Sequence, residues 1–215
     1  MTNLFKKELF AFFILLSFHF SWVHSFFMIK LDGMTLANIL TLFRILILFP
    51  FIGMFYIDAH WANGVAVVLY LTACFTDYLD GMVARGFNHV STFGKFLDPI
   101  ADKLLIATTI IMLAGTGRLE GTALLPALII LGREIFISGL REHLSLENVN
   151  VPVSVLAKWK TAVQMISLSY LLADGPKKYV WGFQEVGVVL LWTAALLSLI
   201  SGYEYWRKGR SIINP

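Results

Sequence analysis

Long apolar stretches, each with the length of a helix, dominate this 215-residue chain. Hydrophobic residue types make up 58% of it and charged types only 14%, whereas soluble domains average about 25% charged residues. An apolar run of about 20 residues is long enough to cross a bilayer as a helix. The sequence therefore predicts an all-α integral membrane protein. Its formal net charge of +3 is explained by basic ends that face anionic membrane lipid, so we expect no nucleic-acid partner.

Six of these stretches predict a bundle of six transmembrane helices. They cover approximately Leu36–Ile57, Trp61–Arg85, Gly94–Gly115, Thr122–His143, a stretch that begins VLAKWKTAVQMI, and Glu185–Trp206. Basic residues follow the last stretch (Arg207, Lys208 and Arg210), which indicates that this end is cytoplasmic. Counting back through the helices puts the loop near Asn88 and the segment from Arg141 to Lys160 on the same side.

The first 34 residues contain a further apolar segment, from Leu9 to Ile29, preceded by Lys6 and Lys7. The segment resembles a signal peptide, although it is longer than usual and no clear cleavage site follows it. It could also span the membrane, but spanning would leave the two lysines outside, against the positive-inside rule. We therefore expect residues 1–34 to be an interfacial, unprocessed or spurious extension. Residues 35–210 would then form the membrane domain, and residues 211–215 a cytoplasmic tail.

Four aspartates interrupt two consecutive apolar stretches: Asp77, Asp80, Asp98 and Asp102. The first two are three residues apart and the last two four apart, so each pair shares one helix face. Antiparallel packing of the two helices would bring the pairs together. Carboxylates at membrane depth are costly and usually functional. Four of them suit two Mg²⁺ or Mn²⁺ ions, which prefer oxygen ligands. A buried charge network or the ion path of a cation transporter are the alternatives.

Polar residues also line one side of the preceding helix. Asn38, Thr41 and Arg44 follow one another at intervals of three residues, which places them along the same side of its first two turns. These positions suit a binding site. A helix cap at Thr35 and a snorkelling Arg44 would explain the same pattern.

The aspartates belong to a longer motif, D-x2-D-G-x2-A-R-x8-G-x3-D-x3-D, that runs from Asp77 to Asp102. This motif resembles that of the CDP-alcohol phosphatidyltransferase family, and the resemblance covers approximately residues 35–210. It implies six transmembrane helices, a homodimer, and two metal ions held by the four aspartates, with Asp102 also acting as the general base. It further implies a nucleotide and diphosphate site, lined by Gly81, Ala84 and Arg85 and bordered by Asn38 and Thr41.

Basic residues in the later helices indicate a second binding region. Arg133 and Glu134 interrupt one apolar stretch, Arg141 follows eight residues later, and Lys158 and Lys160 begin the next helix. The four basic side chains could converge on the phosphate of an acceptor, since arginine suits bidentate phosphate binding. The lysines could instead anchor the helix at the cytoplasmic edge. A basic acceptor pocket favours a phosphorylated alcohol.

Four further segments are similar to the bacterial phosphatidylglycerophosphate synthase branch of this family: LTLFR, TFGKFLDPIADK, LGREIFISGLR and AKWKTAVQM. The resemblance implies transfer of the phosphatidyl group from CDP-diacylglycerol to sn-glycerol 3-phosphate, with release of CMP. It places the reaction at the cytoplasmic face of a bacterial inner membrane. Inositol phosphate and phosphatidylglycerol, the latter in a cardiolipin synthase, remain open as acceptors.

Overall fold

A computed structural model describes residues 36–87, 92–146, 154–174 and 182–213, and the regular secondary structure of this part is all helical. Its α-helices run in chain order as α2 (Leu36–Met54), α3 (His60–Phe87), α4 (Thr92–Gly115), α5 (Leu124–Leu146), α6 (Val155–Ala173) and α7 (Phe183–Ile213). A short 3₁₀ helix, η1 (Gly121–Ala123), precedes α5. The expected all-α architecture is thus confirmed for the described residues, while the N-terminal segment and the loop at Asn88 lie outside them.

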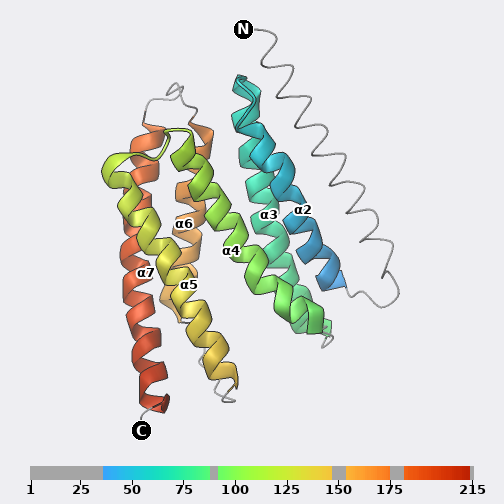
Figure 1. Cartoon of the computed structure of the whole chain (residues 1–215), viewed down its shortest axis with the longest axis vertical. Coiled ribbons are helices and arrows are strands. Elements are labelled where there is room, and N and C mark those ends of the chain that lie inside the picture. The colour runs from blue at the N-terminus through green and yellow to red at the C-terminus, as the bar shows by residue number, and fades with distance from the viewer. Residues whose placement is uncertain (1–35, 88–91, 147–153, 175–181, 214–215) are drawn as a thin grey trace.

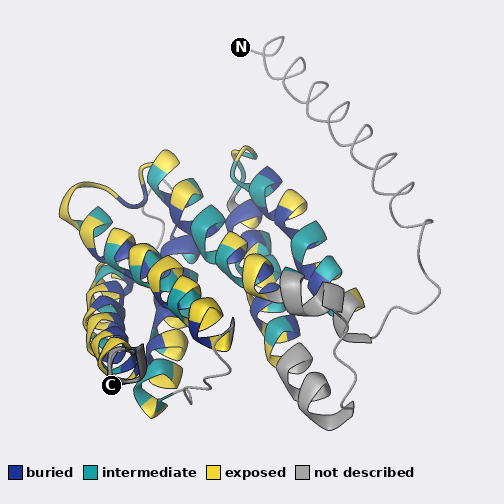
Figure 2. Cartoon of the chain, turned by 60° about the horizontal axis from the view of Figure 1, so that its bottom comes forward, coloured by how far each residue is buried: buried dark blue, intermediate teal, exposed yellow. Residues whose placement is uncertain are grey.

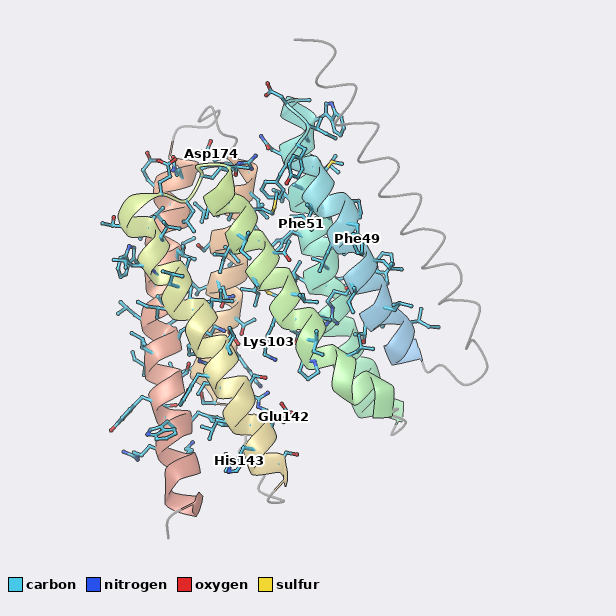
Figure 3. All side chains as sticks on the ribbon, viewed as in Figure 1. Phe49, Phe51, Lys103, Glu142, His143 and Asp174 are labelled. Carbon is cyan, nitrogen blue, oxygen red and sulfur yellow. The ribbon has the colours of Figure 1, made fainter. Side chains whose placement is uncertain are left out.

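Consecutive helices alternate in direction, so the bundle has two ends (Figure 1). The helices α2, α3 and α4 form one side and α5, α6 and α7 the other. Contacts between α3 and α6 and between α4 and α5 join the two sides. Asp174 lies at one end of the bundle, whereas Glu142 and His143 lie toward the other (Figure 3). The site described below is nearer the second end.

Many apolar residues are buried between the helices, and many others are exposed; Figure 2 shows how buried and exposed positions are distributed over the helices. On α2, for example, Phe51 is buried while Phe49 is exposed (Figure 3). Exposed aliphatic and aromatic residues suit contact with lipid chains. Two segments, Gly121–Ser145 and Phe183–Gly209, are long and apolar enough to cross a membrane. The six-span arrangement stays a prediction.

At the end of the bundle away from the site, Arg118 contacts several segments of the chain. Gly117 has a positive φ of 70°, which suits glycine, and the turn after α4 sends the chain back so that Arg118 is buried. Its guanidinium donates to Asn63 Oδ1 of α3 at 2.8 Å and to the Leu172 carbonyl of α6 at 3.0 Å. It also lies 5.1 Å from the centre of the Phe55 ring. One side chain thereby connects segments from both sides of the bundle.

The predicted helices agree with the observed ones to within a few residues at most ends. The largest difference is at the C-terminal end, where α7 continues to Ile213 rather than ending near Trp206. The helix therefore includes residues 211–213 of the predicted cytoplasmic tail, whose location stays a prediction. Since basic residues such as Arg207 and Lys208 are good helix formers, they do not mark the end of a helix.

Candidate active site

A buried arginine connects three helices at the centre of the site. The Arg44 guanidinium, from α2, donates to Asp102 Oδ1 of α4 at 2.6 Å and lies 3.1 Å from Asp77 Oδ1 of α3. The Arg44 side chain is 1% exposed, whereas those of Asp77 and Asp102 are 43% and 47% exposed. The arginine therefore lies beneath the two carboxylates and compensates their charge from the interior side, which leaves their outer surfaces accessible.

The helical register of α2 explains why Arg44 points inward. Thr41 precedes it by three residues, and both side chains are only 1% exposed. They therefore share the face that α2 turns toward α3 and α4, since residues three apart are neighbours on a helix. The shared face of Thr41 and Arg44 was a sequence prediction. The ion pairs of Arg44 with two aspartates were missed, and they exclude snorkelling to the membrane surface.

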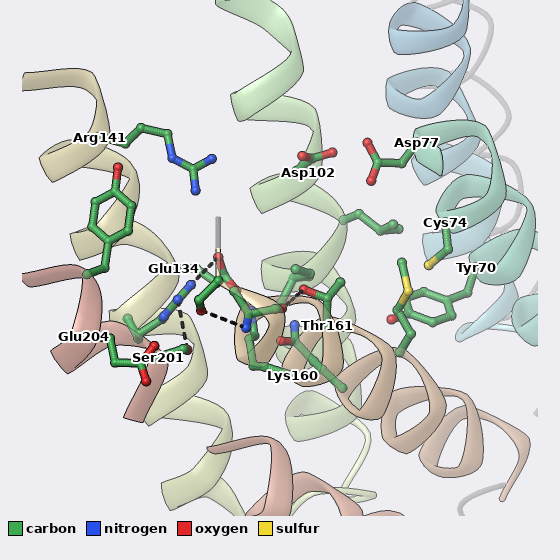
Figure 4. Close-up of a pocket in the computed structure, with 18 of the residues that line it drawn as sticks. Tyr70, Cys74, Asp77, Asp102, Glu134, Arg141, Lys160, Thr161, Ser201 and Glu204 are labelled. Carbon is green, nitrogen blue, oxygen red and sulfur yellow. Dashed lines mark hydrogen bonds and ion pairs between the residues drawn. The ribbon is translucent and has the colours of Figure 1, made fainter. Parts of the chain in front are cut away.

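The two aspartates open into a cavity of about 290 Å³ (Figure 4). Figure 4 shows Asp77 and Asp102 pointing toward each other from α3 and α4, while Arg141 reaches into the cavity from α5. Every described α-helix except α2 contributes to the lining. The lining residues are Tyr70, Cys74, Asp77, Asp102, Leu105, Ile106, Arg133, Glu134, Arg141, Ser154, Ala157, Lys160, Thr161, Gln164, Met165, Ser201, Glu204, Tyr205 and Lys208.

A set of basic side chains forms the opposite wall of the cavity. Lys160 of α6 is buried and forms an ion pair with Glu134 of α5. Arg133 donates to Ser201 Oγ of α7 at 3.1 Å and lies 3.7 Å from Glu134. The Arg141 guanidinium stacks over the Tyr205 ring at 5.7 Å. We call Arg133, Arg141 and Lys160 the basic wall.

The N-terminus of α6 positions Lys160 in this wall. Ser154 caps the helix, because its hydroxyl accepts a hydrogen bond from the Ala157 amide at 3.3 Å. Lys160 follows six residues after the cap and is buried. Lys158, only two residues earlier, is exposed and does not line the cavity. The structure therefore brings three of the four predicted acceptor-binding residues together and leaves Lys158 outside.

Residues 34–200 match the sequence model of the CDP-alcohol phosphatidyltransferase family. The chain belongs to this family. A relative from Rickettsia bellii, named CDP-diacylglycerol--glycerol-3-phosphate 3-phosphatidyltransferase, is 44% identical over 83% of this chain and 96% of its own length. An Arabidopsis thaliana protein named CDP-diacylglycerol--glycerol-3-phosphate 3-phosphatidyltransferase 1, chloroplastic/mitochondrial, is 38% identical over 81% of this chain and 62% of its own.

A rice relative carries a different name. This protein, from Oryza sativa subsp. japonica, is named Cardiolipin synthase (CMP-forming), and it is 38% identical over 81% of this chain and 57% of its own length. The CDP-alcohol phosphatidyltransferase family thus includes similar sequences with different names for their activity. Family membership defines the class of reaction more closely than it defines the acceptor.

Two aspartates of the family motif have the chemistry of metal ligands. Asp77 and Asp102 expose carboxylate oxygens at the cavity, and hard divalent cations prefer such ligands. Asp80 and Asp98 follow and precede them by one helical turn, in α3 and α4. Among the described side chains, no group of three or more histidine, cysteine, aspartate or glutamate residues forms a metal cluster. The chemistry of the described donors nevertheless fits a magnesium-type ion.

The remaining two predicted metal ligands and four of the predicted nucleotide-site residues belong to described helices, but their side chains are outside the described part. These are Asn38, Asp80, Gly81, Ala84, Arg85 and Asp98. Conversely, several cavity residues had no role assigned from the sequence, namely Glu134, Gln164, Ser201, Glu204 and Lys208. The charge of Glu134 within an apolar stretch was a usable signal. Ser201 had no such signal, because it is an ordinary small residue in a long helix.

Proposed function

We propose that this protein transfers the phosphatidyl group of CDP-diacylglycerol to sn-glycerol 3-phosphate, with release of CMP. The observation that carries the proposal is a single cavity with half-exposed carboxylates on one side and a basic wall on the other. The aspartate side suits a metal-bound diphosphate, and the basic wall suits a second phosphate. The names of the relatives from Rickettsia bellii and Arabidopsis thaliana support the same reaction.

The basic wall explains the choice of a phosphorylated acceptor. Arg141 offers a planar fork of donors to the cavity, which matches the geometry of a phosphate. Arg133 and Lys160 add positive charge, while Glu134 and Ser201 fix the positions of these two side chains. An acceptor phosphate held by this wall would place its alcohol end toward Asp102. Choline has no anionic group for this wall, and serine offers a carboxylate in place of a phosphate.

The chemistry follows from this placement. The acceptor hydroxyl gives its proton to the Asp102 carboxylate, which acts as a general base. The acceptor oxygen then forms a bond to the β-phosphorus of CDP-diacylglycerol. The bond from that phosphorus to the bridging oxygen breaks, and CMP leaves with the electron pair. Divalent cations held by Asp77, Asp80, Asp98 and Asp102 would neutralise the charge of the diphosphate.

The membrane arrangement is part of the same proposal. Residues 35–210 would form a domain of six spanning helices in a bacterial inner membrane, as a homodimer. The cavity would open to the cytoplasm, because the end of the bundle nearest to it carries Arg141, Lys158, Arg207 and Lys208. A soluble, phosphorylated acceptor would then enter from the cytoplasm and the lipid from the bilayer.

CMP release tests the reaction. The purified protein in detergent would receive CDP-diacylglycerol and Mg²⁺, with or without glycerol 3-phosphate. We expect CMP release that depends on both the metal and the acceptor. Asp102→Asn should lower turnover by about 100-fold or more, while nucleotide binding partly survives. Full activity in this variant would exclude Asp102 as the base.

A second candidate is suggested by the rice relative. The same cavity would then use phosphatidylglycerol as the acceptor and form cardiolipin. CMP release with phosphatidylglycerol but not with glycerol 3-phosphate would favour this candidate. CMP release with inositol phosphate alone would favour a third acceptor. Ion flux into vesicles without CMP release under any condition would indicate a cation transporter.

A further inference from the structure

An apolar groove runs between α5 and α7 on the outside of the bundle. It has a volume of about 530 Å³, within the usual range of about 300–1,000 Å³ for ligand pockets. Leu128 and Phe136 of α5 and Leu199 of α7 line it and are exposed, which suits contact with lipid. The rings of Phe136 and Trp206 lie 5.6 Å apart at one part of its wall.

Arg133 separates this groove from the cavity and belongs to the lining of both. Its guanidinium donates a hydrogen bond to Ser201 Oγ and lies near Glu134. Its aliphatic stem lies over Gly202, where an added Cβ would be 3.3 Å from Arg133 Cγ. The polar end of this side chain therefore faces the cavity and its apolar part faces the groove. This is the boundary that a molecule with a charged head and an apolar chain would cross.

The direction of the groove also suits an acyl chain. On α5 the groove residues lie between 128 and 137, whereas the cavity residues lie between 133 and 141. On α7 the corresponding ranges are 199–206 and 201–208. Both helices run toward the cavity end of the bundle (Figure 1). The groove therefore overlaps the cavity along both helices and extends further from that end, to Leu128 on α5 and Leu199 on α7, within two segments long enough to cross a membrane.

We propose that one acyl chain of the lipid substrate lies in the groove between α5 and α7 while the phosphates of the same molecule occupy the cavity. This inference rests on the proposed function, because it takes CDP-diacylglycerol as the occupant. The groove and the cavity adjoin at Arg133, which lines both, and this favours a single molecule that occupies the two sites. The apolar lining of the groove matches a hydrocarbon chain, and the basic wall matches the phosphates.

Two glycines of α5 provide a test with a matched control. Gly132 lines the groove, and an added Cβ there meets no atom within 4 Å. A leucine at this position can therefore fill the groove without a clash inside the bundle. Gly139 is seven residues further on nearly the same side of α5, is exposed and also has open space, but it lines neither the groove nor the cavity. Gly139→Leu is thus the control for Gly132→Leu.

The probe is CDP-diacylglycerol with a photoreactive diazirine in the middle of one acyl chain. After illumination of the full-length protein, mass spectrometry identifies the labelled peptides. We expect label on α5 between residues 128 and 137 and on α7 between residues 199 and 206. Gly132→Leu should lose most of this label and Gly139→Leu should keep it. In parallel, Gly132→Leu should raise the KM for the lipid severalfold and leave the KM for glycerol 3-phosphate unchanged.

The labelling experiment and the CMP-release assay test the groove and the proposed reaction separately. Absence of CMP release with the expected labelling pattern would reject the proposed reaction and keep the groove as an acyl-chain site. CMP release with label spread evenly over the exposed helix faces would reject the groove. Unchanged labelling in Gly132→Leu together with a loss of dimer, measured by light scattering, would assign the groove to a second copy and overturn the inference.

Discussion

Arg44 is the residue on which the aspartate side of the cavity depends. Its guanidinium bonds carboxylates from two different helices, and its side chain is almost completely buried. Without it, two negative charges would face each other at the edge of an apolar bundle. A divalent cation and Arg44 would share the task of neutralising these charges, from opposite sides of the carboxylates.

Replacement of Arg44 should therefore affect both stability and activity. We expect Arg44→Ala to lower the free energy of unfolding by about 1–3 kcal/mol, because a hydrogen bond to Asp102 and an ion pair with Asp77 are lost. CMP release should also fall strongly. Arg44→Lys keeps the charge but cannot fork between two carboxylates, so it should recover stability only in part. Thermal unfolding in detergent and CMP release measure the two effects; a wild-type melting temperature in Arg44→Ala would contradict the structural role.

Arg141 should contribute mainly to binding of the acceptor. We expect Arg141→Ala to raise the KM for glycerol 3-phosphate more than the KM for CDP-diacylglycerol, because the residue belongs to the basic wall. Steady-state kinetics with each substrate varied in turn separates the two constants. Arg207 is exposed on α7 and does not line the cavity, so Arg207→Ala is the control for loss of a surface charge. A larger increase in the KM for CDP-diacylglycerol would instead assign Arg141 to the binding of the lipid substrate.

At the scale of single residues, the sequence indicated which charged residues could form the site, but it did not predict which residues contact one another. Charged residues in apolar helices drew attention to the aspartate motif, and the expected approach of its two helices agrees with the shared contact of Asp77 and Asp102 with Arg44. The ion pair of Arg44 with Asp102 joins residues 58 positions apart, and no local pattern specifies such a pair. Lys158 and Lys160 look equivalent in the sequence. Lys160 faces the cavity because of its rotational position on α6, which begins after the cap at Ser154.

At the scale of the helices, α6 and α7 pack closely against each other toward the end of the bundle away from the cavity. Gly187 of α7 lies against Leu171 of α6, where an added Cβ would be 2.9 Å from the leucine side chain. Ser167 strengthens the same contact by donating to the Gly187 carbonyl at 2.7 Å. The apolar runs predicted both helices, because their length and composition are local properties. The close contact at Gly187 depends on the facing helix and was not predictable.

Gly187→Ala should weaken this contact. Leu171 is 1% exposed and has little room to move, so we expect a loss of about 1–3 kcal/mol of unfolding free energy from overpacking. The same change at Gly139, where an added Cβ meets nothing, should be neutral or slightly stabilising. Thermal melting of both variants in the same detergent gives the comparison. Equal melting temperatures would show that α7 can shift to accept the methyl group.

At the scale of the whole molecule, the two ends of the bundle have separate tasks. Arg118 ties the helices at one end, and the cavity lies nearer the other. Arg118→Ala would leave Asn63 Oδ1 and the Leu172 carbonyl without this donor, at a cost of about 1–3 kcal/mol for each buried acceptor. We expect a lower melting temperature with unchanged KM values for both substrates. A selective rise in either KM would show that the two ends are coupled.

The position of Arg44 also bears on how the chain enters the membrane. In the proposed topology, α2 is synthesised before α3 and α4, so Arg44 emerges before either of its carboxylate partners. A lone arginine at the centre of a helix opposes insertion by about 2.5–3.5 kcal/mol on translocon scales. Partitioning of α2 into the bilayer would therefore depend on the arrival of Asp77 and Asp102. The same three residues that form the aspartate side of the cavity would thus set the order of its biogenesis.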